Sequence, residues 1–181
     1  MTGGVTETLT RQRVLYLVTS GAPAPEGIPE LVKLCHQAGW QVLVFATPLG
    51  VRFLDLAAVE QLTGQPVRTD YRMPDESKTL PPAEAVLACP LTFNSTNKFA
   101  HGHADNFVIG LLCELAGSAV PTIVVPHCKP QLAIHPAFSA SLATLRDMGV
   151  TVIFDPDAPY ERRVPPWRDV VAALPSHVPA R

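Results

Sequence analysis

Short apolar runs alternate along the chain with stretches in which apolar residues recur at helical spacing. The runs predict buried strands at residues 14–18, 42–46, 85–89, 122–125 and 150–154, and the spaced stretches predict helices at 26–38, 51–62, 95–116, 137–148 and 167–174. Strands that are apolar on both faces and separated by helices are typical of a parallel sheet covered on both sides. We therefore predict a single α/β domain over residues 13–174, a doubly wound, Rossmann-like parallel sheet with helices on both faces, between a polar tail at 1–12 and a C-terminal tail at 175–181.

Composition narrows the possible partners. Charged residues make up 17% of the chain and hydrophobic residues 47%, so part of the surface is expected to be covered by a partner subunit. The net charge of −2 and the 14 scattered Lys and Arg residues argue against nucleic-acid and membrane partners. No apolar run approaches the roughly 18 residues that span a bilayer, and residues 1–13 lack the apolar core of a signal peptide. We expect a cytoplasmic protein with four reduced cysteines and no metal site.

Sheets of this kind bind ligands at the carboxyl ends of their strands, so the loops that follow the strands are the candidate sites. Thr19, Ser20 and Gly21 offer two hydroxyls and a glycine amide just before a helix, a setting that favours a phosphate. An ordinary helix N-cap would use the same residue types. Thr47 places another hydroxyl directly after the second strand.

The loop after the third strand carries more polar groups than a helix cap needs. Between a buried strand and a predicted helix it holds five small polar side chains: Thr92, Asn94, Ser95, Thr96 and Asn97. A cap uses one or two such side chains. The surplus predicts a ligand with many hydrogen-bonding edges, such as a flavin.

Residues 90–106, PLTFNSTNKFAHGHADN, resemble the PASANT motif and following helix of the homo-oligomeric flavin-containing cysteine decarboxylases, which read PASANTxxKxAxGxxDN. The resemblance covers roughly residues 13–155. It implies FMN as the cofactor and a substrate that is a small molecule or the C-terminus of a peptide, bound by a homotrimer or a dodecamer of trimers with FMN near a subunit interface. The FMN-binding positions that it implies are Thr19, Ser20, Gly21, Thr47, Pro90, Thr92, Phe93, Asn94 and Ser95.

The catalytic positions of that family are changed in this sequence. Where the family has a histidine ahead of the motif, an ungapped count reaches Glu76, which is either a general base or a solvated acid. Lys129 replaces the substrate-binding asparagine, and His127 is either a displaced base or a structural residue. Beyond the last predicted strand, Arg162 and Arg163 are either an anion clamp or a solvated basic pair.

Two functional hypotheses follow from the resemblance. In the first, the protein is an FMN-dependent enzyme that oxidises and decarboxylates a cysteinyl or related carboxylate substrate, with Glu76, Lys129 and His127 as the candidate catalytic residues. In the second, it binds FMN as a regulatory or assembly subunit without decarboxylase activity, which the loss of both family residues would suit. A relative of the flavin-modifying prenyltransferases shares the fold but fits the Asn94 motif less well.

Overall fold

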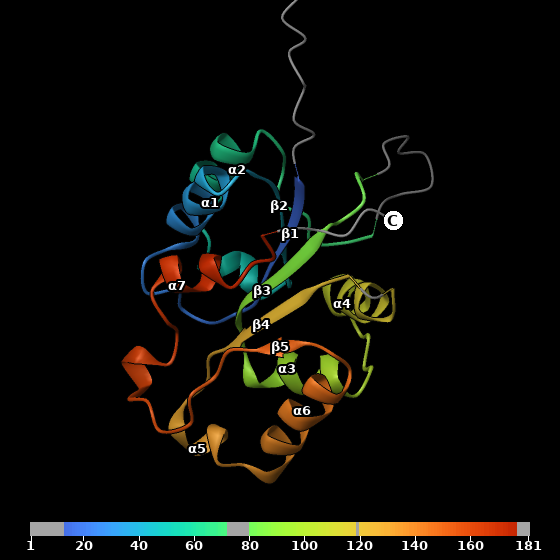
Figure 1. The fold of residues 1–181 in the computed structure, drawn as a ribbon, viewed down its shortest axis with the longest axis vertical. Coiled ribbons are helices and arrows are strands. Elements are labelled where there is room, and N and C mark those ends of the chain that lie inside the picture. The colour runs from blue at the N-terminus through green and yellow to red at the C-terminus, as the bar shows by residue number, and fades with distance from the viewer. Residues whose placement is uncertain (1–12, 72–79, 119, 177–181) are drawn as a thin grey trace, which may run out of the picture.

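The computed structural model describes residues 13–71, 80–118 and 120–176. Its centre is a sheet of five parallel strands in the order β2-β1-β3-β4-β5 (Figure 1). The strands are β1 (Arg13–Thr19), β2 (Trp40–Ala46), β3 (Ala85–Leu91), β4 (Thr122–Pro126) and β5 (Thr151–Val152). The order reverses between β1 and β3, which places the topological switch point there. The predicted parallel sheet is confirmed, although β5 is shorter than the predicted strand.

Helices cover both faces of this sheet (Figure 1). One face carries α1 (Ile28–Gln37), α2 (Leu56–Thr63) and α7 (Trp167–Ala172), and the other carries α3 (Phe93–Ala100), α4 (Phe107–Gly117) and α6 (Pro136–Asp147). Three short elements lie in loops: α5 (Pro130–Ala133) and the 3₁₀ helices η1 (Gly50–Phe53) and η2 (Tyr160–Arg162). None of the helices in the described part of the chain combines the length and apolarity that a bilayer crossing needs.

The strands bury side chains on both faces because successive residues of a strand point to opposite sides. In β1, Leu15 and Leu17 join the core beneath α1, α2 and α7, while Tyr16 and Val18 join the core beneath α3, α4 and α6. Polar groups are therefore confined to the ends of the strands, and the carboxyl ends carry the candidate loops.

The predicted helix at 95–116 is wrong, because the structure has two helices there. α3 ends at Ala100, Gly102 takes a left-handed backbone with φ 68°, and the Asn106 side chain accepts the Ile109 N–H at 3.2 Å to begin α4. A left-handed glycine ends a helix and an asparagine caps the next one. The predicted helix at 51–62 is divided in the same way, since Asp55 caps α2 after η1.

The break between the two helices also sets the surroundings of His101 and His103. His101 is the C-cap of α3, and its ring centroid lies 6.2 Å from that of His103. The His101 Nε2 atom lies 3.3 Å from the hydroxyl oxygen of Ser141 on α6. Over the described ranges, no cluster of three or more His, Cys, Asp or Glu residues is placed to hold a metal ion.

Candidate cofactor site

Ser20 joins the carboxyl ends of β1 and β3 through its hydroxyl group. The Ser20 hydroxyl donates to the Pro90 carbonyl oxygen at 3.2 Å and accepts the Thr92 N–H at 2.8 Å. The Ser20 N–H also donates to the Pro90 oxygen, at 3.2 Å. The side chain is 1% exposed, so these bonds are shielded from water. We call this set of contacts the Ser20 bridge; it fixes the start of the loop that leads into α3.

The loop after β2 is held against the loop after β1. The Thr47 N–H donates to the Thr19 carbonyl oxygen at 3.0 Å, and the Thr47 hydroxyl accepts the Gly50 N–H at 3.0 Å. A Cβ at Gly50 would lie 2.9 Å from Thr47 Oγ1 and 3.0 Å from the Ser20 Cα, so only glycine fits this turn. The Thr47 hydroxyl hydrogen remains available for a further bond.

The third loop presents the N-terminus of α3. Thr92 is its N-cap: its hydroxyl accepts the Ser95 N–H at 3.2 Å and donates to the Ser95 hydroxyl at 3.0 Å. The first N–H groups of a helix have no acceptor within the helix, and they carry the positive end of the helix dipole. Ser95 keeps a hydroxyl hydrogen to donate, and Asn94 is exposed at the same end.

These three loops line a cavity of about 340 Å³ at the switch point of the sheet, which we call the polar cavity after the hydroxyl and amide side chains in its wall. Among the described residues, the Gly21 N–H beside it donates to no acceptor. The walls thus hold several hydrogen-bond donors and one helix N-terminus, a combination that attracts an anionic group. The residues that line this cavity are Gly21, Thr47, Pro48, Leu49, Thr92, Asn94, Ser95, Lys98 and Asn106.

Five of the nine predicted cofactor positions therefore line one cavity, namely Gly21, Thr47, Thr92, Asn94 and Ser95. The other four lie behind it. Thr19 and Ser20 are buried beneath the loops, and Pro90 follows a cis peptide bond within β3. Phe93 turns away and stacks on Phe138 of α6, with ring centroids 5.6 Å apart.

Sequence reasoning did not select four of the lining residues. Lys98 and Asn106 were part of the motif, but a continuous helix would have separated them by two turns. In the structure the loop between α3 and α4 folds back, and the Lys98 amine bonds the Asp105 carboxylate. This bond holds the pKa of Asp105 below its ordinary value. Pro48 and Leu49 had no chemical signal in the sequence.

Of the candidate catalytic residues that the structure describes, neither Lys129 nor His127 lines this cavity. Glu76 lies outside the described residues. Lys129 is exposed at the start of α5. His127 is 6% exposed, and its Nδ1 contacts the Pro23 carbonyl oxygen at 3.2 Å while its ring stacks on Tyr160 at 4.7 Å.

Burial lowers the pKa of His127; the backbone carbonyls of Pro23 and Tyr160 oppose this in part, and the positive charge of Arg163 adds a smaller lowering. The neutral imidazole is therefore favoured. Its Nε2 atom is buried and has no hydrogen-bond partner within the described part of the chain. This histidine is held as a packed residue between two loops, with neither ring nitrogen in the polar cavity.

Comparison with known proteins decides the family. The chain matches the Flavoprotein family over residues 4–178. It belongs to that family. The match extends beyond residues 13–155, over which the sequence showed its resemblance to the flavin-containing cysteine decarboxylases, and it spans nearly the whole chain.

The relatives of this Flavoprotein chain include decarboxylases. It is 28% identical over 147 residues to the coenzyme A biosynthesis bifunctional protein CoaBC of Mycolicibacterium smegmatis, covering 79% of this chain and 34% of that protein. The chain thus spans about a third of the length of this CoaBC protein. Its structure resembles that of TvaF, an FMN-dependent cysteine decarboxylase from thioviridamide biosynthesis (TM-score 0.71, 23% identity, 91% of this chain and 98% of that chain). It also resembles HAL3 from Cryptococcus neoformans (TM-score 0.71, 25% identity, 90% of this chain and 94% of that chain).

Proposed function

We propose that this protein binds FMN in the polar cavity and oxidises and decarboxylates a cysteinyl or related carboxylate substrate. The observation that carries the proposal is the convergence of three strand-to-helix loops on one cavity at the switch point of the sheet. Membership of the Flavoprotein family and the FMN-dependent relatives support the choice of cofactor. The protein's free cysteines suit a reducing compartment, in keeping with a place in the cytoplasm.

The residues of the cavity fit the anionic end of FMN. A phosphate dianion needs several donors held in place, and the Gly21 N–H, the Thr47 hydroxyl and the N-terminus of α3 supply them. Asn94 and Ser95 add amide and hydroxyl edges for the remaining polar atoms of the cofactor. When bound, FMN would supply an acceptor for the two electrons released by oxidation of the substrate.

The protein must then provide a base and a carboxylate anchor. Lys129 is exposed near the carboxyl end of β4, where its amine is free to meet a substrate carboxylate as a point charge. We propose Glu76 as the base, because His127 is enclosed on both sides. A carboxylate acts as a base near neutral pH only if its surroundings raise its pKa.

A second function remains a candidate because of the enclosed His127. With its Nδ1 against Pro23 and its ring under Tyr160, this histidine has no path to a substrate in the described geometry. A protein that binds FMN as a regulatory or assembly subunit needs the polar cavity but no base. Cofactor binding and catalysis must therefore be tested separately.

The test is to reconstitute the protein with FMN and follow flavin absorbance and fluorescence. Asn94→Ala and Thr47→Val should weaken FMN binding, whereas Asn97→Ala, on the same helix but outside the cavity lining, should not. A peptide ending in cysteine is then added without oxygen. Bleaching of the flavin bands and a product lacking carbon dioxide and two hydrogens would support the enzyme, and FMN binding without turnover would favour the subunit. Failure to bind FMN would refute both.

We also propose that a second copy of the chain covers the rim of this cavity in a homotrimer or a larger assembly of trimers. Leu49, which lines the cavity, is 54% exposed, and Phe53 and Leu56 continue the apolar surface at 48% and 37% exposure. Exposed apolar patches of this kind mark interfaces. Phe53→Asp should dissociate the assembly in analytical ultracentrifugation, whereas Met148→Asp, at a similarly exposed site at the C-cap of α6, should not.

A further inference from the structure

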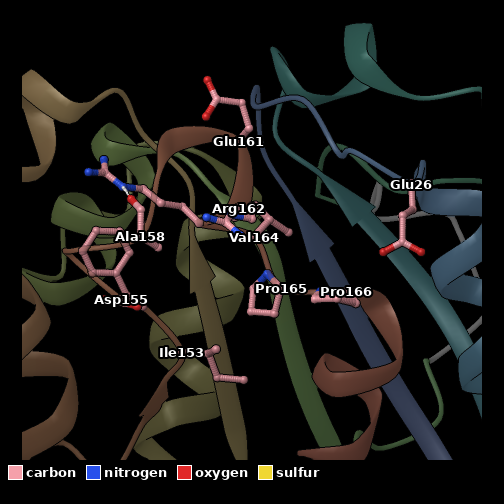
Figure 2. A pocket seen from close by; sticks show the side chains of 11 residues that line it. Glu26, Ile153, Asp155, Ala158, Glu161, Arg162, Val164, Pro165 and Pro166 are labelled. Atoms are coloured by element: carbon pink, nitrogen blue, oxygen red, sulfur yellow. Dashed lines mark hydrogen bonds between the residues drawn. The ribbon is translucent and has the colours of Figure 1, made fainter.

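A second, larger cavity lies beyond the end of β5. It has a volume of about 630 Å³, which is in the range of small-molecule sites, and it shares no lining residue with the polar cavity. The segment from Asp155 to Pro166 forms most of its wall, and Glu26 closes one end (Figure 2). Much of the wall is apolar, contributed by Ile153, Phe154, Ala158, Val164, Pro165 and Pro166.

Arg163 brings a buried positive charge to this wall. It is 6% exposed, so the expectation of a solvated basic pair is wrong for Arg163, although the adjoining Arg162 is exposed. The guanidinium donates to three backbone carbonyl oxygens: Nε to Ala158 at 3.2 Å, Nη1 to Cys128 at 3.2 Å and Nη2 to Pro156 at 3.3 Å. These acceptors are neutral, and the guanidinium also lies over the Phe154 ring, 5.7 Å from the ring centroid. Two of its five N–H groups have no acceptor among the described residues, and its charge has no anionic partner there.

Among the described residues, no carboxylate lies within 4 Å of this guanidinium. Of the three acidic residues in the wall, two accept hydrogen bonds from backbone N–H groups and one points away from the cavity. Glu26 accepts the Trp167 N–H at 2.9 Å, and Asp155 accepts the Asp157 N–H at 2.9 Å. Figure 2 shows the Glu161 carboxylate rising away from the rest of the wall.

A buried charge without a counter-ion is unfavourable, and a guanidinium does not lose its proton in a protein. The spare N–H groups of Arg163, the exposed cation of Arg162 and the apolar wall together select a ligand with a charged head and an apolar body. We propose that this cavity is a binding site for an organic carboxylate with an aliphatic or aromatic body, separate from the flavin site.

Isothermal titration with 4-phenylbutyrate and its neutral analogue 4-phenylbutanamide tests this proposal on the whole protein. The acid should bind roughly tenfold more tightly than the amide, because hydrogen bonds to a charged group are stronger than those to a neutral one. Ala158→Phe, which fills the cavity, should abolish binding. Arg162→Gln should weaken binding of the acid only, and Arg168→Gln, exposed on α7 outside the cavity, should change neither.

Arg163→Gln also removes three backbone ties and so tests folding as well as binding. Ala158→Phe and Arg162→Gln keep those ties and decide the question. Added FMN should leave the affinity for 4-phenylbutyrate unchanged. Equal affinity for acid and amide, binding that survives Ala158→Phe, or displacement by FMN would each overturn the proposal, whatever the protein's activity toward flavin substrates.

Discussion

The Ser20 bridge offers the sharpest test of how the cofactor site is built. In Ser20→Ala the hydroxyl is lost, and its two partners are affected differently. The Pro90 carbonyl oxygen keeps the bond from the Ser20 N–H at 3.2 Å. The Thr92 N–H loses its acceptor at 2.8 Å and is left unpaired at a partly buried position.

An unpaired buried donor costs about 1–3 kcal/mol, so we expect the apoprotein to lose about 2 kcal/mol of stability. In a domain of this size that loss lowers Tm by roughly 4–8 °C. The assay is urea or thermal unfolding of the apoprotein, with Ser139→Ala as the matched control because Ser139 is exposed on α6. Surface substitutions of that kind usually change stability by less than about 0.5 kcal/mol.

The same variant separates two roles for Ser20. Its hydroxyl hydrogen is already donated to Pro90, so the structure assigns Ser20 to the loop rather than to the cofactor. Ser20→Ala should then reduce apoprotein stability more than FMN affinity. An apoprotein as stable as Ser139→Ala, with FMN affinity largely lost, would refute this reasoning and restore direct contact with the phosphate.

Two further predictions concern other positions. Gly50→Ala should lower both Tm and FMN affinity, because the new Cβ would lie 2.9 Å from Thr47 Oγ1, whereas Gly117→Ala meets no atom within 4 Å and should leave both unchanged. Burial holds the pKa of His127 below its ordinary 6.5, so the unfolded chain takes up this proton first and stability falls as the pH drops through that value. His127→Gln should therefore flatten the decline of Tm between about pH 7.5 and 5.5, and the exposed His103→Gln should not; a slope unchanged by His127→Gln would contradict the assignment.

The sequence predicted the strands of the sheet well because buried strands have a simple hydrophobic pattern. Strands β1 to β4 are buried on both faces, so each appears in the sequence as a continuous apolar run. The helix break at residues 101–106 was missed for the opposite reason. Apolar spacing continued across it, while the two signals of a break, Gly102 and Asn106, are local and weaker than a long periodic pattern.

The sequence predicted which loops form the candidate site, but not which way their side chains point. Small polar residues after strands pointed to Thr47, Thr92 and Asn94, which do line the cavity. Sequence does not say which way a side chain turns, so Phe93 was grouped with them although it packs on α6. The sequence also does not show that Arg163 is buried while Arg162 is exposed, because the burial of Arg163 depends on tertiary contacts with the Cys128, Pro156 and Ala158 carbonyls.

The break between α3 and α4 also sets the charge of the polar cavity. In an unbroken helix Lys98 and Asp105 would be separated by about 10.5 Å along the axis, too far to pair. The turn returns Asp105 to Lys98 and neutralises the only cation among the residues that line the described cavity. An anion would then be held by the helix dipole and by neutral hydrogen-bond donors. Salt reduces this attraction only slightly, because it mainly screens interactions between charges. FMN affinity should accordingly vary weakly with ionic strength. In Asp105→Asn the charge of Lys98 would be unpaired, and FMN affinity should then fall clearly as the salt concentration rises.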